Sequence, residues 1–342
     1  MSDLPRPRIS IIVPAYNNKA ELDECLQALT TSSYPDAEII VVDDASTDDL
    51  PRVAARRGVR VVRRERNGGP GAARNSGALH ARGDILFFVD ADVVIAPGAV
   101  GRVARVLDEN PDLAAVFGSY DAQPRARGVV SQYRNLLHHF VHQAGNSEAS
   151  TFWGGCGAVR RAVFQELGGF DEKRFPRPSI EDIEFGYRLR RAGYRVLLDK
   201  GLQGTHLKRW TLLSVIRTDI TRRAIPWSRL ILESGTVPDD LNLKRSQRLS
   251  VALVALLCVL LPLAAIRVEV LAPAAAAVLG VILLNRKLFS FFLRQRGPLF
   301  TLACIPLHLL YYLYSGLSYL FVRIVWQFRG PATRPRDAMQ RG

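Results

Sequence analysis

The segment FVDADVV, residues 88–94, places two aspartates one residue apart at the end of an apolar run that begins at Ile85. Five consecutive apolar residues, Ile85–Val89, are typical of a strand that is buried on both faces of a parallel sheet. Asp90 and Asp92 would point to the same side if the strand continued through them. Two close carboxylates repel each other unless they share a proton or a cation. The segment therefore predicts a buried strand whose end presents two carboxylates to one ligand.

The neighbouring sequence repeats this strand pattern and separates the strands by helices. Four more short apolar runs occur at Ile9–Val13, Glu38–Val42, Val59–Val62 and Leu113–Phe117. The intervals contain helix-like stretches at 22–29, 50–57, 71–81 and 99–107. Alternating strands and helices predict an α/β fold with a mostly parallel sheet that helices cover on both faces.

In such a sheet, ligands bind beyond the carboxyl ends of the strands. Three of the predicted strands end in polar segments, at Pro14–Asn17, Asp43–Ser46 and Asp90–Asp92. We therefore expect one acidic crevice at this edge. A hard divalent cation, magnesium or manganese, would suit Asp90 and Asp92 and leave positions open for substrate phosphates. The alternative is that Asp92 caps the helix that follows Pro97.

Two further motifs could surround a phosphorylated ligand. In VVDDASTDD, residues 41–49, Asp43 and Asp44 follow a strand and could accept hydrogen bonds from a nucleobase or ribose. In NGGPGAARNSG, residues 67–77, the glycine amides and Arg74 could approach a diphosphate. The second motif fits neither the dinucleotide-binding fingerprint nor the Walker A pattern, and a simple turn before a helix also explains it.

Two later segments contain candidates for the chemical step. SIEDIEFGYRLRRAG, residues 179–193, has Glu181 and Asp182 at a predicted helix start; either is a candidate general base, and helix-dipole stabilisation is the alternative. In GTHLKRWTL, residues 204–212, Arg209 or Lys208 could neutralise a leaving diphosphate.

In the same segment Trp210 could stack on a sugar ring, and His206 could ligate the metal or contact phosphate. A membrane-interface anchor is the alternative for this basic aromatic stretch. Elsewhere, HHFVH, residues 138–142, lacks the HExxH form of a zinc site, so we expect its histidines to be solvated or to belong to an acceptor loop.

The composition supports a folded protein with an anionic partner. The 342 residues are 48% hydrophobic and 23% charged, and the formal net charge is +14. Such a charge favours nucleic acid, acidic lipid or a phosphorylated substrate without choosing among them. The four cysteines show no metal-ligand spacing, which fits a reducing compartment, and the N-terminus shows no signal-peptide core.

The last third of the chain predicts membrane attachment. An amphipathic stretch at 211–232 is followed by two uncharged runs, Leu249–Ile266 and Val270–Leu284, with lysines and arginines on both outer sides. This pattern predicts a helical hairpin whose two ends are cytoplasmic. A third apolar segment, 299–325, is long enough to cross once, or could break near Ser315–Gly316.

In their order along the chain, IIVPAYNN, VVDDAST, NGGPGAARN, FVDAD, GGCGAVRR, IEDIEFGYRLRRAG and HLKRW resemble glycosyltransferase family 2, a family of inverting enzymes with the GT-A fold. The resemblance covers residues 8–212. It implies a GT-A catalytic domain at 1–210. Interface helices and a linker at 211–248, membrane helices at 249–328 and a basic tail at 329–342 complete the expected organisation.

The resemblance also implies site roles. Pro14 and Tyr16 would line a nucleotide pocket and Asp44 would contact the base or ribose. Asp90 and Asp92 match the family's metal-binding motif, and Asp182 matches its catalytic base. His206 stands where the family's processive synthases carry Gln.

The expected activity is transfer of one sugar, with inversion and a divalent metal, from a nucleotide-sugar donor to a lipid or lipid-linked acceptor. The expected location is the cytoplasmic face of a membrane that the chain crosses several times, with no nucleic-acid partner. The alternatives are a polysaccharide synthase subunit and a non-catalytic membrane scaffold.

Overall fold

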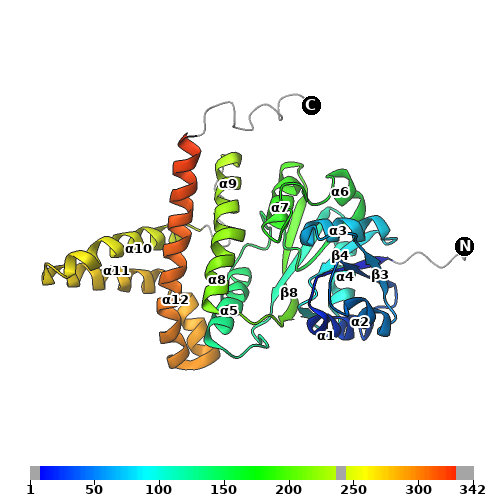
Figure 1. Ribbon diagram of the computed structural model, residues 1–342, viewed down its shortest axis with the longest axis horizontal. Helices are drawn as coiled ribbons and strands as arrows, with labels where there is room; N and C mark the ends of the chain where they lie inside the picture. Colours follow the sequence, from blue (N-terminus) through cyan, green and yellow to red (C-terminus); the bar gives the residue numbers. More distant parts are fainter. Residues whose placement is uncertain (1–7, 236–243, 329–342) are drawn as a thin grey trace, which may run out of the picture. The chain divides into compact units, whose positions relative to one another are not determined.

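The computed structural model describes residues 8–235 and 244–328 (Figure 1). The chain divides into two compact units between Arg209 and Trp210. The predicted basic tail, 329–342, and part of the predicted linker, 236–243, lie outside the described residues.

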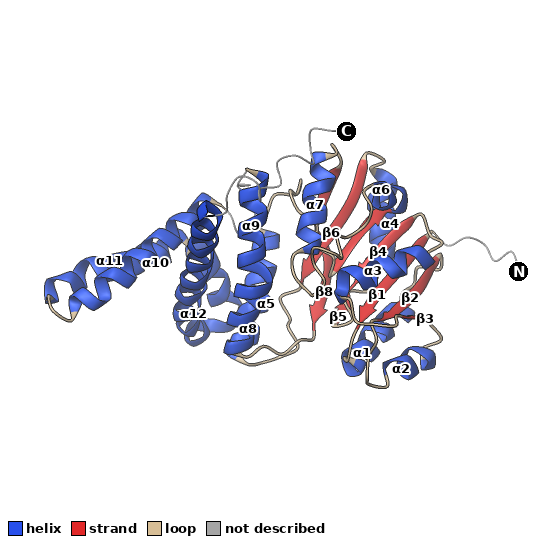
Figure 2. Cartoon of the chain, turned by 45° about the horizontal axis from the view of Figure 1, so that its top comes forward, coloured by secondary structure: helices blue, strands red, loops and turns tan. Residues whose placement is uncertain are grey.

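The first unit is built on one eight-stranded sheet, drawn in red in Figure 2. Its strands are β1 (Ile9–Ala15), β2 (Ala37–Asp43), β3 (Arg60–Arg63), β4 (Ile85–Val89), β5 (Val93–Ile95), β6 (Leu113–Tyr120), β7 (Cys156–Arg160) and β8 (Arg195–His206). The strand order is β3-β2-β1-β4-β7-β6-β8-β5. Pairs among β3, β2, β1 and β4 are parallel, as is β6 with β8, whereas β7 and β5 run antiparallel to their neighbours. The sheet is therefore mixed, with a parallel half that the sequence predicted.

Within residues 8–209 this unit has seven helices: α1 (Lys19–Thr30), α2 (Leu50–Arg56), α3 (Gly69–His80), α4 (Ala99–Glu109), α5 (Val129–Gln143), α6 (Arg161–Glu166) and α7 (Glu181–Arg191). Alternation along the strands decides which helix covers which face. Ile9, Ile11 and Val13 share a buried cluster with residues of α1, α2 and α4. On the other face, Phe88 packs against Phe164 of α6. Helices therefore cover both faces, as the all-apolar strands predicted.

The predicted strands and helices of the first 120 residues all occur, and β4 has the predicted bounds. Strands β5, β7 and β8 were not predicted as strands. Strand β8, RVLLDKGLQGTH, mixes charged residues, glycines and apolar residues, and β5 has only 3 residues. Both lie at one side of the sheet, where β5 is the edge strand and pairs antiparallel with β8, so neither shows the long apolar run that marks a central parallel strand.

The second unit is helical. Its helices are α8 (Leu212–Thr218), the π-helix η1 (Asp219–Ala224), α9 (Ile225–Ser234), α10 (Arg245–Ala264), the 3₁₀-helix η3 (Val268–Val270), α11 (Leu271–Leu284) and α12 (Arg286–Phe328). Val254, Val281 and Tyr312 form a buried cluster that joins α10, α11 and α12. Helix α12 continues through Ser315–Gly316, so the break considered there is wrong.

The backbone of α12 instead departs from helical geometry at Gly297, where φ is 80° and ψ is −179°. A positive φ of this size suits glycine, which has no Cβ to clash. Two helices, α10 and α12, are long and apolar enough to cross a membrane by length and composition, whereas the apolar stretch Val268–Leu284 is shorter. These features weakly indicate membrane association.

Candidate active site

The sheet pairing brings the Asp-x-Asp segment between two other motifs. Strand β4 ends at Val89, and the backbone N–H of Asp90 donates to the carbonyl of Gly155 at 3.0 Å. On the other side, β5 pairs with β8 so that Val93 lies opposite His206. His206 Nε2 consequently lies 3.4 Å from Asp92 Oδ2. The two carboxylates therefore lie between the segment before β7 and the end of β8.

Arg74 connects Asp90 to the second acidic motif. Its side chain, from α3, is 4% exposed. One terminal nitrogen donates to Asp90 Oδ1 at 2.6 Å and the other to Glu181 Oε1 at 3.0 Å. Burial would lower the pKa of this guanidinium, but the carboxylates of Asp90 and Glu181 outweigh it and raise the pKa. Arg74 is therefore a fixed cation that holds two acidic motifs at one place.

Asp182, beside Glu181, is held by backbone donors. Its Oδ2 accepts from the N–H of Gly154 at 3.0 Å, and its Oδ1 accepts from the N–H of Ile183 at 2.8 Å. Burial and the neighbouring Glu181 raise the pKa of Asp182 to about 7, against the lowering influence of Arg74. A carboxyl group with this pKa can release and accept a proton near neutral pH.

The pKa values of the Asp-x-Asp pair are shifted in opposite directions. Burial raises the pKa of Asp90, and Arg74 only partly offsets this. Burial also acts to raise the pKa of Asp92, but the facing His206 ring, in its protonated form, lowers it below its ordinary value. Asp92 is therefore the more readily ionised member of the pair.

Asp44 organises the glycine-rich loop. Its carboxylate is 4% exposed and lies 2.6 Å from a terminal nitrogen of Arg64. The same carboxylate accepts from the N–H of Gly68 at 3.1 Å and from that of Gly69 at 2.8 Å. The loop that precedes α3 is thus tied directly to the end of β2.

Two other predicted nucleotide contacts, Pro14 and Tyr16, lie at the same edge of the sheet, at the end of β1. Pro14 is buried within β1, and Tyr16, just after it, is 47% exposed. The end of β1 is tied to the end of β2 because Asn17 Oδ1 accepts from the N–H of Thr47 at 2.8 Å. Arg209 is exposed at the end of the first unit, and Trp210 is the first residue of the second.

The residues present fit a divalent cation with open coordination positions. No three His, Cys, Asp or Glu side chains converge tightly enough to hold a metal ion in the part of the chain that the structure describes. Asp92 Oδ2 and His206 Nε2, however, are 3.4 Å apart. Two ligands that lie about 2.2 Å from one ion, about 100° apart, have a similar separation. This pair leaves the remaining positions for ligand oxygens.

Several site residues had no predicted role. Gly154 and Gly155 allow the close approach of other groups, and a Cβ on Gly154 would lie 3.1 Å from the Arg74 guanidinium carbon. Asn135 Oδ1, on α5, lies 2.6 Å from His206 Nδ1 and accepts its hydrogen bond, and Tyr120 stacks on the His206 ring with the ring centroids 4.2 Å apart. In the sequence, Asn135 belongs to a stripe of polar residues in the stretch 129–143, but nothing in the sequence indicates that this stripe contacts His206.

The histidines of HHFVH lie on α5, so the prediction of solvated or acceptor-loop residues is wrong for His142. This residue is 7% exposed, and its Nδ1 lies 3.0 Å from the carbonyl oxygen of Gly118. The rings of His138 and His142 are 4.0 Å apart, beside Trp153. Burial lowers the pKa of His138 well below its ordinary value. These histidines form part of an aromatic cluster.

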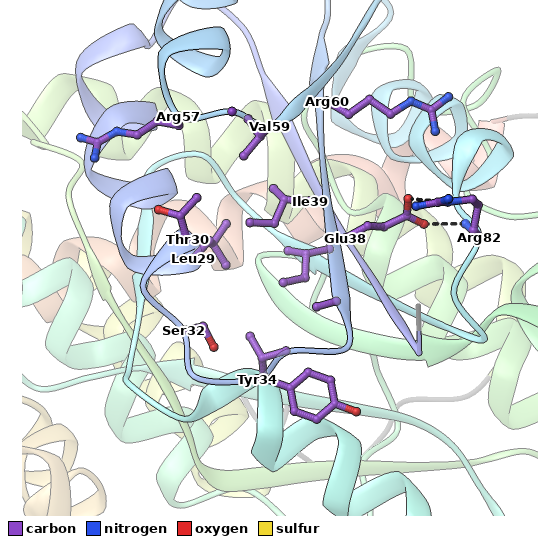
Figure 3. A pocket seen from close by; sticks show the side chains of 14 residues that line it. Leu29, Thr30, Ser32, Tyr34, Glu38, Ile39, Arg57, Val59, Arg60 and Arg82 are labelled. Carbon is purple, nitrogen blue, oxygen red and sulfur yellow. Dashed lines mark hydrogen bonds and ion pairs between the residues drawn. The ribbon is translucent and has the colours of Figure 1, made fainter. Parts of the chain in front are cut away.

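A separate cavity lies at the opposite end of the parallel strands. It measures about 650 Å³ and is lined by Glu38, Ile39 and Arg82, among others (Figure 3). Glu38 and Ile39 stand at the start of β2, whereas Asp43 stands at its end. The cavity contains none of the predicted site residues, and Glu38 is paired with Arg82. The predicted site residues of the first unit therefore lie away from this cavity.

Comparisons with known proteins find similar sequences and a similar fold. Residues 10–168 match the family described as Glycosyl transferase family 2. An uncharacterized glycosyltransferase of Haemophilus influenzae is 30% identical over 196 residues, which are 53% of this chain and 61% of that protein. An uncharacterized protein of Mycobacterium tuberculosis is 36% identical over 202 residues, which are 54% of this chain and 62% of that protein. The chain thus spans less than two thirds of the length of these relatives.

Among solved structures, a mannosyltransferase of Pyrobaculum calidifontis in complex with GDP-Man and Mn²⁺ has a similar fold. The match has a TM-score of 0.58 and 21% sequence identity, and it covers 95% of this chain and 88% of that one. At this identity the likeness concerns the fold, which is the GT-A-like mixed sheet with flanking helices followed by a helical region.

Proposed function

We propose that the chain is a metal-dependent, inverting glycosyltransferase, because residues 10–168 match the family described as Glycosyl transferase family 2. It transfers one sugar from a nucleotide-sugar donor to a hydroxyl or phosphate of a lipid or lipid-linked acceptor. The reaction takes place at the cytoplasmic face of a membrane to which the helical unit attaches.

The observation that supports the proposal most strongly is the double contact of Arg74. Because one guanidinium binds both Asp90 and Glu181, the Asp-x-Asp segment and the segment that contains Asp182 lie in one site. A metal-binding pair and a candidate base are thereby close enough to act on one substrate. Retention of all these side chains argues against a non-catalytic scaffold.

The donor would bind at the carboxyl edge of the sheet. Tyr16 is exposed there, and Asp44, whose N–H donates to the carbonyl of Ala15, accepts from the amides of Gly68 and Gly69. Asp44 would contact the base or ribose, and Pro14 and Tyr16 would line the nucleotide pocket. We assign Arg209 to the leaving diphosphate and Trp210 to the sugar.

Asp92 and His206, with Asp90 beside them, would hold Mg²⁺ or Mn²⁺. The bound ion would neutralise the donor diphosphate and the charge that develops on it as the glycosidic bond breaks. Asp90 is already engaged by Arg74 through one oxygen. Asp92 is therefore the principal carboxylate ligand in this proposal.

Asp182 would act as the general base. Its two backbone hydrogen bonds fix the carboxylate, and its pKa of about 7 allows it to take a proton from an acceptor hydroxyl at neutral pH. Attack by that oxygen on the face opposite the leaving diphosphate inverts the anomeric centre. Where the acceptor is a phosphate, Asp182 would orient it instead.

The helical unit supports a lipid or lipid-linked acceptor. Apolar side chains such as Leu256, Val259 and Leu261 are exposed on α10. Burying such surface in a bilayer is favourable, and the unit joins the catalytic unit directly at Arg209–Trp210. A catalytic unit tethered in this way would meet acceptors at a high local concentration.

The decisive experiment measures nucleotide release by the full chain in detergent with lipid extract and Mn²⁺. The donor panel includes GDP-, UDP- and dTDP-sugars, with GDP-Man first because the structurally similar mannosyltransferase was solved with it. Asp182→Asn tests the base, and Asp23→Asn, on the half-exposed partner of Arg57, is the matched control. We expect acceptor-dependent release that Asp182→Asn abolishes and Asp23→Asn preserves.

Product size separates the proposal from its alternatives. A single added sugar supports the transferase, whereas a long product would support a polysaccharide synthase subunit. Release that is equally fast in Asp182→Asn would refute the assigned base. Donor binding without turnover on any acceptor would favour the scaffold.

A further inference from the structure

We propose that Asn135 is a positioning residue that fixes the tautomer of His206, so that its Nε2 lone pair faces Asp92 and the two side chains can share a divalent cation. The inference rests on the proposed function only for the role that the cation has in sugar transfer. Which nitrogen of His206 carries the proton does not depend on the reaction.

The orientation of the Asn135 amide is set by its own helix. Asn135 is 1% exposed, and its Nδ2 donates to the carbonyl of Ser131, one turn earlier on α5, at 3.0 Å. The opposite amide orientation would place two carbonyl oxygens against each other at this distance. Asn135 therefore presents Oδ1, an acceptor, to His206.

An acceptor at this position determines which imidazole nitrogen is protonated. Asn135 Oδ1 lies 2.6 Å from His206 Nδ1. A hydrogen bond of this length requires that Nδ1 carries the proton, because amide oxygens have no hydrogen to donate. In the neutral ring the other nitrogen, Nε2, then has a free lone pair.

That lone pair points at the candidate metal site. Nε2 lies 3.4 Å from Asp92 Oδ2, and the neutral ring places no proton between these atoms. Two lone pairs at this distance repel each other unless a cation lies between them. The neutral Nδ1–H form of His206 and ionised Asp92 thus form a two-ligand site, whereas an Nε2–H ring would donate to Asp92 and compete with the cation.

The ring is also held in its plane. Tyr120, at the end of β6, stacks on His206 with ring centroids 4.2 Å apart and an angle of 10° between the planes. Stacking restrains the plane but does not distinguish the two nitrogens. The distinction therefore depends on Asn135. Partners of this kind orient metal-binding histidines, and their loss commonly weakens metal affinity by about 10–100-fold.

The test is a direct reading of the tautomer by ¹⁵N NMR on the full chain, selectively labelled at histidine and free of metal, at about pH 8.5, where an ordinary imidazole is neutral. His206→Gln identifies the signal. We expect a protonated Nδ1 and an unprotonated Nε2 in the parent. An Nε2–H ring, or a ring protonated on both nitrogens, would overturn the inference.

The second measurement is Mn²⁺ affinity, followed by electron paramagnetic resonance with MnCl₂ as the only ligand. We expect Asn135→Ala to weaken binding about 10–100-fold, and Asn135→Asp, which keeps an oxygen facing Nδ1, to retain most of it. Gln132→Ala is the matched control, because Gln132 is a buried amide on α5 that donates to the carbonyl of Ala126. Equal Mn²⁺ affinity of the parent and Asn135→Ala, or no binding by the parent, would refute the proposal.

These outcomes are independent of sugar transfer. A chain that has the expected tautomer and loses Mn²⁺ in Asn135→Ala, yet consumes no donor, would refute the proposed function and leave the role of Asn135 intact. Sugar transfer by a chain whose His206 ring is protonated on Nε2 would support the proposed function and refute the role of Asn135.

Discussion

The ionisation of Asp182 predicts how the transfer rate changes with pH. Its pKa is raised to about 7, first by burial and then by the neighbouring Glu181. A general base works only when it is deprotonated, so the rate should rise as the pH rises through this value. With a pKa of about 7, roughly 9% of the enzyme is active at pH 6, half at pH 7 and roughly 91% at pH 8.

The assay is the initial rate of nucleotide release at low donor concentration between pH 5.5 and 9, with thermal melts at each pH as the control for unfolding. We expect the rate to increase about tenfold from pH 6 to pH 8. A plot of the logarithm of the rate against pH should have a slope near one well below pH 7 and a plateau well above it. At pH 8 Asp182→Asn should lower the rate by about 10²–10⁴-fold, and the variant should lose the pH dependence, so that its deficit is about tenfold smaller at pH 6. A rate that is constant from pH 6 to pH 8 in the folded parent would refute the assignment of Asp182 as the base.

Three more predictions concern stability and location. Arg74→Met should lower the free energy of unfolding by about 3–5 kcal/mol, because the buried Glu181 and the partly buried Asp90 lose their shared cation. Denaturant titration measures this change, and Arg57→Met, at a surface pair, should lower the free energy of unfolding far less. Gly186→Ala should give little folded protein, because a Cβ there would overlap the backbone at 151–152. The control is Gly128→Ala, which has open space around the new Cβ and should express normally. Equal yields of the two variants would contradict the prediction. Cys258, exposed on α10, should not react with a membrane-impermeant maleimide in intact membranes, because the proposed bilayer covers it, and should react after detergent is added. Labelling without detergent would argue against the insertion of α10 in the membrane.

The parallel half of the fold could be predicted because its signal is local. Ile85–Val89 is a run of apolar residues, and both faces of β4 are buried, so the run and the strand coincide. Strand β8 could not be found in this way. Its polar residues, such as Asp199 and Gln203, interrupt the pattern, and its pairing with β5 depends on residues far away in the sequence.

The same distinction applies to the site. Asp90, Asp92 and Asp182 could be proposed as site residues from the sequence because their motifs are short and lie at predicted strand ends or helix starts. The contacts that connect them could not, because they involve side chains whose meeting depends on tertiary packing. Arg74 was expected to approach a diphosphate, and its engagement by Asp90 and Glu181 becomes visible only once α3 and α7 lie on the same face of the sheet.

The charge at the site explains why a cation belongs to the proposed mechanism. The protein as a whole has a formal charge of +14, yet the candidate site brings together Asp90, Asp92, Glu181 and Asp182 near one buried arginine, Arg74. Both terminal nitrogens of that arginine are already bound to carboxylates. A donor diphosphate that approached these groups directly would meet like charge in a poorly solvated place, where repulsion is strong. Basic residues elsewhere can attract an anionic donor or an acidic membrane, but only a cation held at Asp92 and His206 would let the diphosphate come to rest beside the base. The same reasoning predicts that donor affinity in Asp92→Asn no longer depends on Mn²⁺, which a donor titration with and without the ion would measure.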